Sequence, residues 1–238
     1  MSNQTKGKIN SIQTLGTLDG PGIRYILFLQ GCPLRCHCCH NPETWDIKAF
    51  TEEKSANEIL SEVKRYRAYF GKEGGITVSG GEALMQADFV FELFLLCKEE
   101  NIHTCIDTSG CIINESVKKL LSVTDLVLLD IKYTNEEDYQ KYTGGSLKKT
   151  IEFLDLLKEM DIQTWIRQVI IPDINDTEEN IFKLKELIKG YNNVKKVELL
   201  PFKKFCNSKY ENLKIEFPFK EKREPTKSEI EKLQALLK

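Results

Sequence analysis

Short runs of apolar and β-branched residues alternate along the chain with longer segments whose apolar positions recur every three or four residues. The short runs have the length and composition of buried strands, and the longer segments have the periodicity of helices that cover a sheet. Strands are predicted at residues 24–29, 75–79, 103–107, 126–130, 164–171 and 196–200. Helices are predicted at residues 55–70, 86–99, 115–121, 147–160, 177–189 and 226–237.

This order repeats a strand followed by a helix six times, which is typical of a parallel sheet with right-handed crossovers. Six units are two fewer than a closed eight-unit barrel contains. We therefore predict an α/β fold with a partial (β/α)6 TIM-like barrel, and a doubly wound open sheet is the alternative. Both place ligands beyond the carboxyl ends of the strands.

The segments between these elements do not divide the chain. No linker rich in Gly, Ser or Pro interrupts it, so we expect a single domain over residues 1–238. The charged stretch KIEFPFKEKREPTK at residues 214–227 is expected to form a solvated excursion before the last helix, within a C-terminal segment of residues 214–238.

Composition and charge narrow the possible partners. The chain has 34 Lys and Arg residues against 36 Asp and Glu residues, and this balance argues against a field that attracts nucleic acid or anionic lipid. The apolar stretches at residues 23–30 and 126–131 are far shorter than the ~20 residues that cross a bilayer. Residues 1–10 lack the apolar core of a signal peptide. We expect a cytoplasmic monomer with no nucleic-acid or membrane partner.

The strongest chemical signal is a cysteine-rich loop that directly follows the first predicted strand. Four of the eight cysteines lie within residues 32–39, beside His40. Because nothing indicates secretion, thiolate chemistry is favoured over disulfides. Cys32, Cys36 and Cys39 are spaced to hold a 4Fe-4S cluster and to leave one iron without a protein ligand. A zinc site made of these cysteines and His40, or a reactive loop, is the alternative.

Together with Ser79-Gly80-Gly81-Glu82 at the end of the second predicted strand, this loop resembles the radical S-adenosylmethionine superfamily. The wider pattern resembles the branch of that superfamily that activates pyruvate formate-lyase. Its segments are TLDGPGIR at 17–24, CHNPETW at 39–45, HTCIDTSG at 103–110, DIK at 130–132, WIR at 165–167 and LLPF at 199–202. No cysteine-rich insert separates Trp45 from Gly80, and this also favours that branch.

The resemblance implies a reaction. The three cysteines would hold the cluster, and S-adenosylmethionine would bind its open iron and be split to a 5′-deoxyadenosyl radical under anaerobic conditions. That radical would remove a hydrogen atom from a glycine Cα of pyruvate formate-lyase and leave a glycyl radical there. Flavodoxin or ferredoxin is the implied electron donor.

The resemblance also implies the residues that contact each ligand. Asp107, Thr108 and Asp130 would hold a monovalent cation. Contacts to S-adenosylmethionine are implied for Cys38, Cys39, His40, Gly80, Gly81, Glu82, Asp130, Ile131, Lys132, Arg167 and Lys203. The protein partner would be received by Asp19, Gly20, Pro21 and Gly22. Taken alone, residues 19–22 have the composition of a tight turn, and residues 107–110 that of a helix cap.

Some positions depart from the pattern of this branch. Cys38 stands where an aromatic residue is usual, and Lys203 where a histidine is usual; residues 205–210 lack an expected glycine and histidine. Several alternatives therefore stay open. They are an activator of another glycyl radical enzyme, such as anaerobic ribonucleotide reductase, a radical enzyme for a small molecule, and a non-enzymatic metal-binding module.

Overall fold

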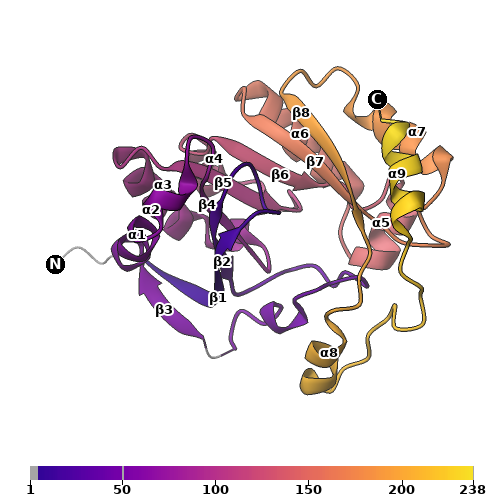
Figure 1. Cartoon of the computed structure of the whole chain (residues 1–238), viewed down its shortest axis with the longest axis horizontal. Helices are drawn as coiled ribbons and strands as arrows, with labels where there is room; N and C mark the ends of the chain where they lie inside the picture. Colours follow the sequence, from indigo (N-terminus) through magenta and orange to yellow (C-terminus); the bar gives the residue numbers. More distant parts are fainter. Residues whose placement is uncertain (1–4, 50, 238) are drawn as a thin grey trace.

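An eight-stranded sheet forms the centre of the computed structural model, which describes residues 5–49 and 51–237 (Figure 1). The strands lie in the order β3-β1-β2-β4-β5-β6-β7-β8. Their bounds are β1 Lys6–Gly16, β2 Arg24–Leu29, β3 Glu52–Ser55, β4 Gly75–Gly80, β5 His103–Thr108, β6 Leu126–Asp130, β7 Gln163–Ile170 and β8 Val194–Pro201. The strands β2, β4, β5, β6, β7 and β8 are parallel, whereas β1 and β3 pair antiparallel at one edge.

The six parallel strands are the six that the sequence predicts, and no boundary differs by more than two residues. Strands β2, β4 and β6 are buried along almost their whole length, because helices cover the outer side of a parallel sheet. The sheet remains open, with β3 and β8 at its two edges. The prediction of a partial (β/α)6 barrel is therefore confirmed.

The helices follow the predicted pattern with two additions. Their bounds are α1 Ala56–Lys64, α2 Arg67–Phe70, α3 Ala87–Glu99, α4 Glu115–Leu121, α5 Glu136–Thr143, α6 Leu147–Glu159, α7 Glu178–Ile188, α8 Asn207–Leu213 and α9 Lys227–Ala235, with 3-10 turns η1 Pro42–Thr44 and η2 Ala83–Gln86. The helix predicted at residues 55–70 is divided into α1 and α2, since Tyr66 leaves the helical conformation at φ −102°. No helix in the described ranges is long and apolar enough to cross a membrane.

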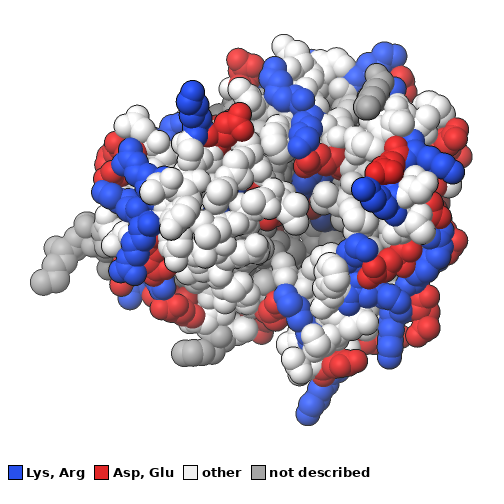
Figure 2. Space-filling model, viewed as in Figure 1, with Lys and Arg blue, Asp and Glu red and all other residues white. Residues whose placement is uncertain are grey.

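The expectation of a solvated excursion at residues 214–227 is wrong for its centre. Phe217 and Phe219 are buried, and both rings pack against Phe202. The charged neighbours of these two rings remain at the surface. The segment therefore packs against the residue that follows β8. Burial of the two aromatic rings outweighs the entropic cost of ordering the chain. On the face shown in Figure 2, the centre is mostly neutral and side chains of both charges lie around the margin.

The alternation of side chains along the strands places two layers inside the curved sheet. A small apolar cluster of Cys105, Leu126, Leu128 and Trp165 fills the interior, apart from the large core beneath the helices. A second layer, of polar side chains, lies next to this cluster. Each of its four members comes two residues after an interior-facing position of its strand. They are Ser79 on β4, Asp107 on β5, Asp130 on β6 and Arg167 on β7. Strand register therefore gathers these four at the carboxyl end of the sheet.

Candidate active site

A cavity of about 270 Å³ lies at the carboxyl ends of the parallel strands. Its lining combines the cysteine loop with the ends of β4 to β7. Most of the predicted residues line it, namely Asp19, Cys32, Cys36, Cys38, Cys39, His40, Gly80, Gly81, Glu82, Asp107, Thr108, Asp130, Lys132 and Arg167. Ile131 is instead buried in the core beneath the helices. The Lys203 amino group pairs with Glu224 at 2.8 Å, so it does not line the cavity.

The cysteine loop is irregular, but contacts from distant parts of the chain fix its backbone. The Arg35 and His37 amides each donate to the last turn of α5 at 2.8 Å. From α8, the Tyr210 hydroxyl donates to the Cys39 carbonyl oxygen at 3.1 Å, and Lys209 Nζ donates to Asn41 Oδ1 at 2.7 Å. Helices α5 and α8, which the sequence does not predict, therefore hold the loop.

The thiols of this loop share the cavity. Burial raises the pKa of Cys36 to about 11 and that of Cys38 to about 12, so metal-free thiols keep their protons at neutral pH. Iron binding would displace protons from its ligands. The Nε2 of His40 lies 2.9 Å from the Lys203 carbonyl oxygen, and this nitrogen is not directed at the thiols. Within residues 5–49 and 51–237, no three His, Cys, Asp or Glu side chains are grouped to hold one metal ion.

The Gly80-Gly81 turn brings the end of β4 close to the cysteine loop. Gly80 has φ +117°, and a Cβ there would lie 2.1 Å from the Leu29 amide nitrogen. A Cβ on Gly81 would lie 2.2 Å from the Gly31 carbonyl oxygen. Glycine is required at both positions because the backbones approach so closely. The turn and the loop thus form one continuous wall of the cavity.

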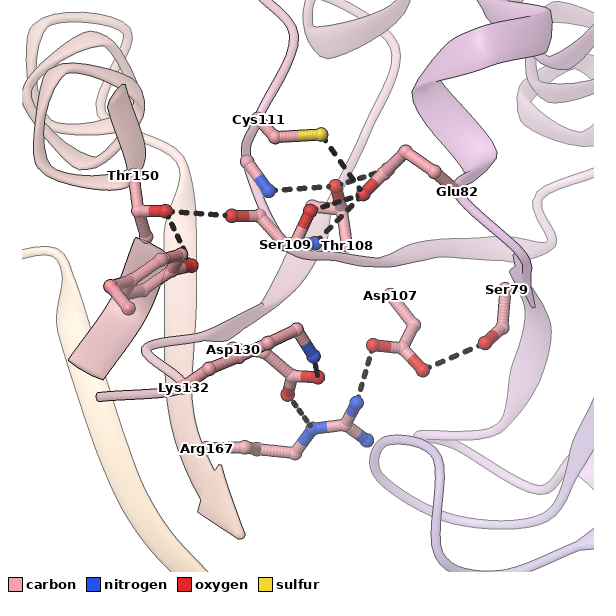
Figure 3. Close-up of polar contacts among 12 residues, drawn as sticks. Ser79, Glu82, Asp107, Thr108, Ser109, Cys111, Asp130, Lys132, Thr150 and Arg167 are labelled. Carbon is pink, nitrogen blue, oxygen red and sulfur yellow. Dashed lines mark hydrogen bonds and ion pairs between the residues drawn. The ribbon is translucent and has the colours of Figure 1, made fainter. Parts of the chain in front are cut away.

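Glu82 is a buried carboxylate whose oxygens are already bound by protein groups (Figure 3). It accepts hydrogen bonds from Thr108 Oγ1 at 2.5 Å, from Ser109 Oγ at 2.6 Å and from the Ser109 amide at 3.0 Å. Burial raises the pKa of Glu82, although these hydrogen bonds oppose the shift. Glu82 therefore joins the end of β4 to the end of β5, and its predicted contact with the cofactor stays a prediction.

Replacing Glu82 with glutamine should destabilise the protein by about 1–3 kcal/mol, because an amide group would face hydrogen-bond donors in a buried site. Urea unfolding measures this loss. The matched control is Glu115→Gln on α4, where the side chain is 83% exposed and pairs with Lys118 at 2.9 Å, and where we expect a much smaller loss because water screens the pair. Equal losses in the two variants would contradict the role of Glu82.

Arg167 is the centre of a buried ionic network (Figure 3). Its guanidinium bonds to Asp107 through Nη2 and to Asp130 Oδ1 through Nε at 3.1 Å. Its Nη1 lies 3.7 Å from Asp19 Oδ1, and Lys132 Nζ lies 3.0 Å from Asp130 Oδ2. Burial and the nearby Asp107 raise the pKa of Asp19 to about 6. Three carboxylates thus surround two cations at the cavity wall, with a formal excess of one negative charge.

This network bears on the predicted cation site. Arg167 stands between Asp107 and Asp130, and Thr108 turns its hydroxyl toward Glu82. A monovalent cation at these residues stays a prediction, and it would have to share the two carboxylates with Arg167. The sequence indicates each charged residue but not this pairing, which depends on the register of β5, β6 and β7.

The residues present fit an iron–sulfur cluster and an adenosine-containing cofactor. Thiols of the loop line one part of the cavity, and Cys38, Val169 and Leu200 give it an apolar part. The Tyr133 hydroxyl is buried and has no hydrogen-bond partner within the described residues. It borders a small space next to Cys38, Lys132 and Val169. Thiols are suitable ligands for iron, and an apolar wall with a free hydroxyl nearby is suitable for an adenosine group.

The Asp19–Gly22 loop reaches the cavity through Asp19 alone. Gly20, Pro21 and Gly22 lie beside it, and the two glycines have φ +117° and +66°. The loop is therefore a turn, as its composition predicts, and it also brings a carboxylate to the cavity. The sequence did not single out Ser79, Thr77 or Arg24 as site residues, although the two-residue spacing of Thr77 and Ser79 on β4 is a signal for a shared face.

Comparisons with known proteins give a family match and named relatives for the chain. A family model described as the Radical SAM superfamily matches residues 26–184. The pyruvate formate-lyase-activating enzyme of Clostridium pasteurianum is 42% identical over 233 residues, which are 98% of this chain and 97% of the relative. The pyruvate formate-lyase 1-activating enzyme of Escherichia coli strain K12 is 39% identical over 97% of this chain and 95% of its own.

Solved structures share the fold. A domain of the pyruvate-formate lyase-activating enzyme from Bacteroides vulgatus has a TM-score of 0.57 and 21% identity, over 69% of this chain and 92% of that domain. A radical SAM methyltransferase from Sphaerobacter thermophilus has a TM-score of 0.63 and 16% identity, over 90% of this chain and 63% of its own. At these identities the likeness concerns the arrangement of the elements.

Proposed function

The chain belongs to the radical SAM superfamily and, within it, to the pyruvate formate-lyase-activating enzymes, and on this premise we propose that it forms a glycyl radical in a pyruvate formate-lyase. When bound, a reduced 4Fe-4S cluster supplies the electron that splits S-adenosylmethionine into methionine and a 5′-deoxyadenosyl radical. The chemistry supplied in this way would be the removal of a hydrogen atom from a glycine Cα of the partner. No general base is required, because hydrogen leaves as an atom.

In this proposal the chain's residues bind and orient the reactants. Cys32, Cys36 and Cys39 would hold the cluster, and these three ligands would leave one iron open to S-adenosylmethionine. The backbone at Gly80 and Gly81 receives the methionine end of the cofactor. The apolar wall at Cys38, Val169 and Leu200 packs against the adenine.

Charged residues complete the proposed binding site. Lys132 and Arg167 offer donors to the carboxylate or ribose of the cofactor. Because Arg167 already bonds to Asp107 and Asp130, it is held in one orientation before any ligand arrives. We propose flavodoxin or ferredoxin as the electron donor, and a cytoplasmic monomer as the working form.

One observation carries the proposal: all four thiols of the loop, two glycines and the Arg167 network line a single cavity, and Asp19 of the predicted partner loop lines it too. Cofactor and protein substrate would therefore meet in the same space. Enclosure in a cavity also keeps a radical away from solvent.

The test is anaerobic reconstitution with iron and sulfide, followed by reductant, S-adenosylmethionine and a recombinant pyruvate formate-lyase. Electron paramagnetic resonance should show a glycyl doublet in the partner, and chromatography should show 5′-deoxyadenosine. Omitting S-adenosylmethionine should remove both. Deoxyadenosine without a doublet would point to another partner or a small molecule, and bound metal without cofactor cleavage would point to a binding module; either result overturns the proposal.

A further inference from the structure

Arg24 is a fully buried cation that lies beneath the Asp19–Gly22 loop. Its hydrogen-bond partners within the described residues are all neutral. They are the Thr77 hydroxyl, the carbonyl oxygens of Pro21, Glu73, Ile76 and His103, and Nδ1 of His103. Burying a charge among neutral groups is costly unless its donors are well used. This guanidinium donates to four backbone carbonyl oxygens, so its role in the structure is to fix the backbone around it.

Two of these bonds fix the backbone of the loop. Arg24 Nη1 donates to the Pro21 carbonyl oxygen at 3.2 Å. Arg24 Nε donates to Thr77 Oγ1 at 2.7 Å, and the same hydroxyl donates to the Asp19 carbonyl oxygen at 2.6 Å. Two carbonyls of the loop are therefore bound, that of Pro21 directly by Arg24 and that of Asp19 through Thr77.

The two glycines of the loop fit around this support. Gly20 has φ +117°, and a Cβ there would lie 3.1 Å from Arg24 Cδ. Gly22 has φ +66°, and a Cβ there would lie 2.5 Å from the Gly74 amide nitrogen. The loop is packed directly on Arg24 and on the segment before β4. Side chains at these glycines would lift it.

His103 completes the support from β5. Its Nδ1 lies 3.3 Å from both terminal nitrogens of Arg24. Burial and the charge of Arg24 lower the pKa of His103 to about 4, so the ring is neutral at neutral pH. A neutral ring is able to accept the hydrogen bond from Arg24. The support therefore carries a single fixed positive charge.

The other side of the loop faces the reactants. Asp19 lines the cavity and lies 3.7 Å from Arg167, while Leu18 is 83% exposed. A loop fixed from below presents its carboxylate to the cavity and an apolar side chain to a protein partner. We propose that Arg24, acting through Thr77, is a positioning residue that holds this loop so that the glycine segment of the partner binds along it. This inference rests on the proposed function.

The variant Thr77→Val tests the inference, because it removes the hydroxyl link to the Asp19 carbonyl and keeps the shape of the side chain. Affinity for the partner, measured by calorimetry with a recombinant pyruvate formate-lyase and S-adenosylmethionine but without reductant, should fall on the order of 10-fold. Affinity for S-adenosylmethionine alone should stay within about twofold. Thr77→Ser retains the hydroxyl and should restore partner affinity.

The results separate this inference from the proposed function. If the wild-type protein forms no glycyl radical, the proposed function fails. If the wild type forms the radical and Thr77→Val binds the partner normally, or loses affinity for both ligands equally, only the positioning role fails. If Thr77→Val does not fold, Thr77→Ala removes the same hydroxyl with a smaller side chain and is read in the same way.

Discussion

Replacing Cys36 with alanine is expected to lower glycyl radical formation by more than about 100-fold. Mutating a residue that only hydrogen-bonds to a metal ligand already lowers metal affinity or activity by about 10- to 100-fold, and Cys36 is itself a predicted ligand. The variant should also bind less iron and sulfide after reconstitution. Cys36 is buried in the wall of the cavity, so its removal would leave the cluster with two of its three predicted protein ligands. Cys32→Ala and Cys39→Ala should behave alike. Metal analysis, visible absorption and the paramagnetic doublet measure the effect.

Cys38→Ala is the matched control. Cys38 lies in the same loop and is half-buried, but it falls outside the spacing of the three ligands. We expect this variant to retain iron and sulfide at the wild-type ratio. Loss of the cluster in Cys38→Ala, with its retention in Cys39→Ala, would show that the ligand assignment is wrong.

Removing the charge of Arg167 should produce the largest loss of stability. In Arg167→Met the carboxylates of Asp19, Asp107 and Asp130 would face one another without their shared cation. Breaking one partner of a buried ion pair costs about 3–5 kcal/mol, because a buried charge is left uncompensated. Urea unfolding of the metal-free protein at neutral pH measures the free energy of unfolding.

Arg67→Met provides the comparison for Arg167. Arg67 has a side chain that is 52% exposed and pairs with Glu100 at 3.4 Å, so its removal should cost less than about 1 kcal/mol. A loss below about 1 kcal/mol in Arg167→Met would mean that the three carboxylates are solvated or protonated without it. In that case the network would not preorganise the cavity.

The sequence predicted strands β2, β4 and β6 well because each is a short apolar run that is buried on both faces. It did not predict β1 or β3. Strand β1 has few fully buried positions among its eleven, and β3 has the sequence Glu-Glu-Lys-Ser. Strand β1 forms by pairing with β2, and β3 forms by pairing with β1, so the information for both lies in the tertiary structure. Helix α5 was missed for a similar reason, since it buries only Tyr139 and Thr143.

In the site, too, local sequence predicts some features, whereas others depend on the tertiary structure. Cysteine spacing and the Gly80-Gly81 turn are local signals, and the structure brings both to one cavity. The pairing of Arg167 with two aspartates and the support of Asp19 by Thr77 and Arg24 depend on residues of different strands that become neighbours only through register. Residue identity alone does not contain that register.

The anchoring of the cysteine loop by α8 has a consequence for biosynthesis. Lys209 and Tyr210 are separated from their partners Asn41 and Cys39 by 168 and 171 positions. During translation the loop emerges early from the ribosome, whereas α8 is made near the end. Because domains fold as their chain becomes available, the loop acquires its final shape only after most of the polypeptide has been released. A cluster that needs the loop in this shape would therefore be inserted only after α8 has been made.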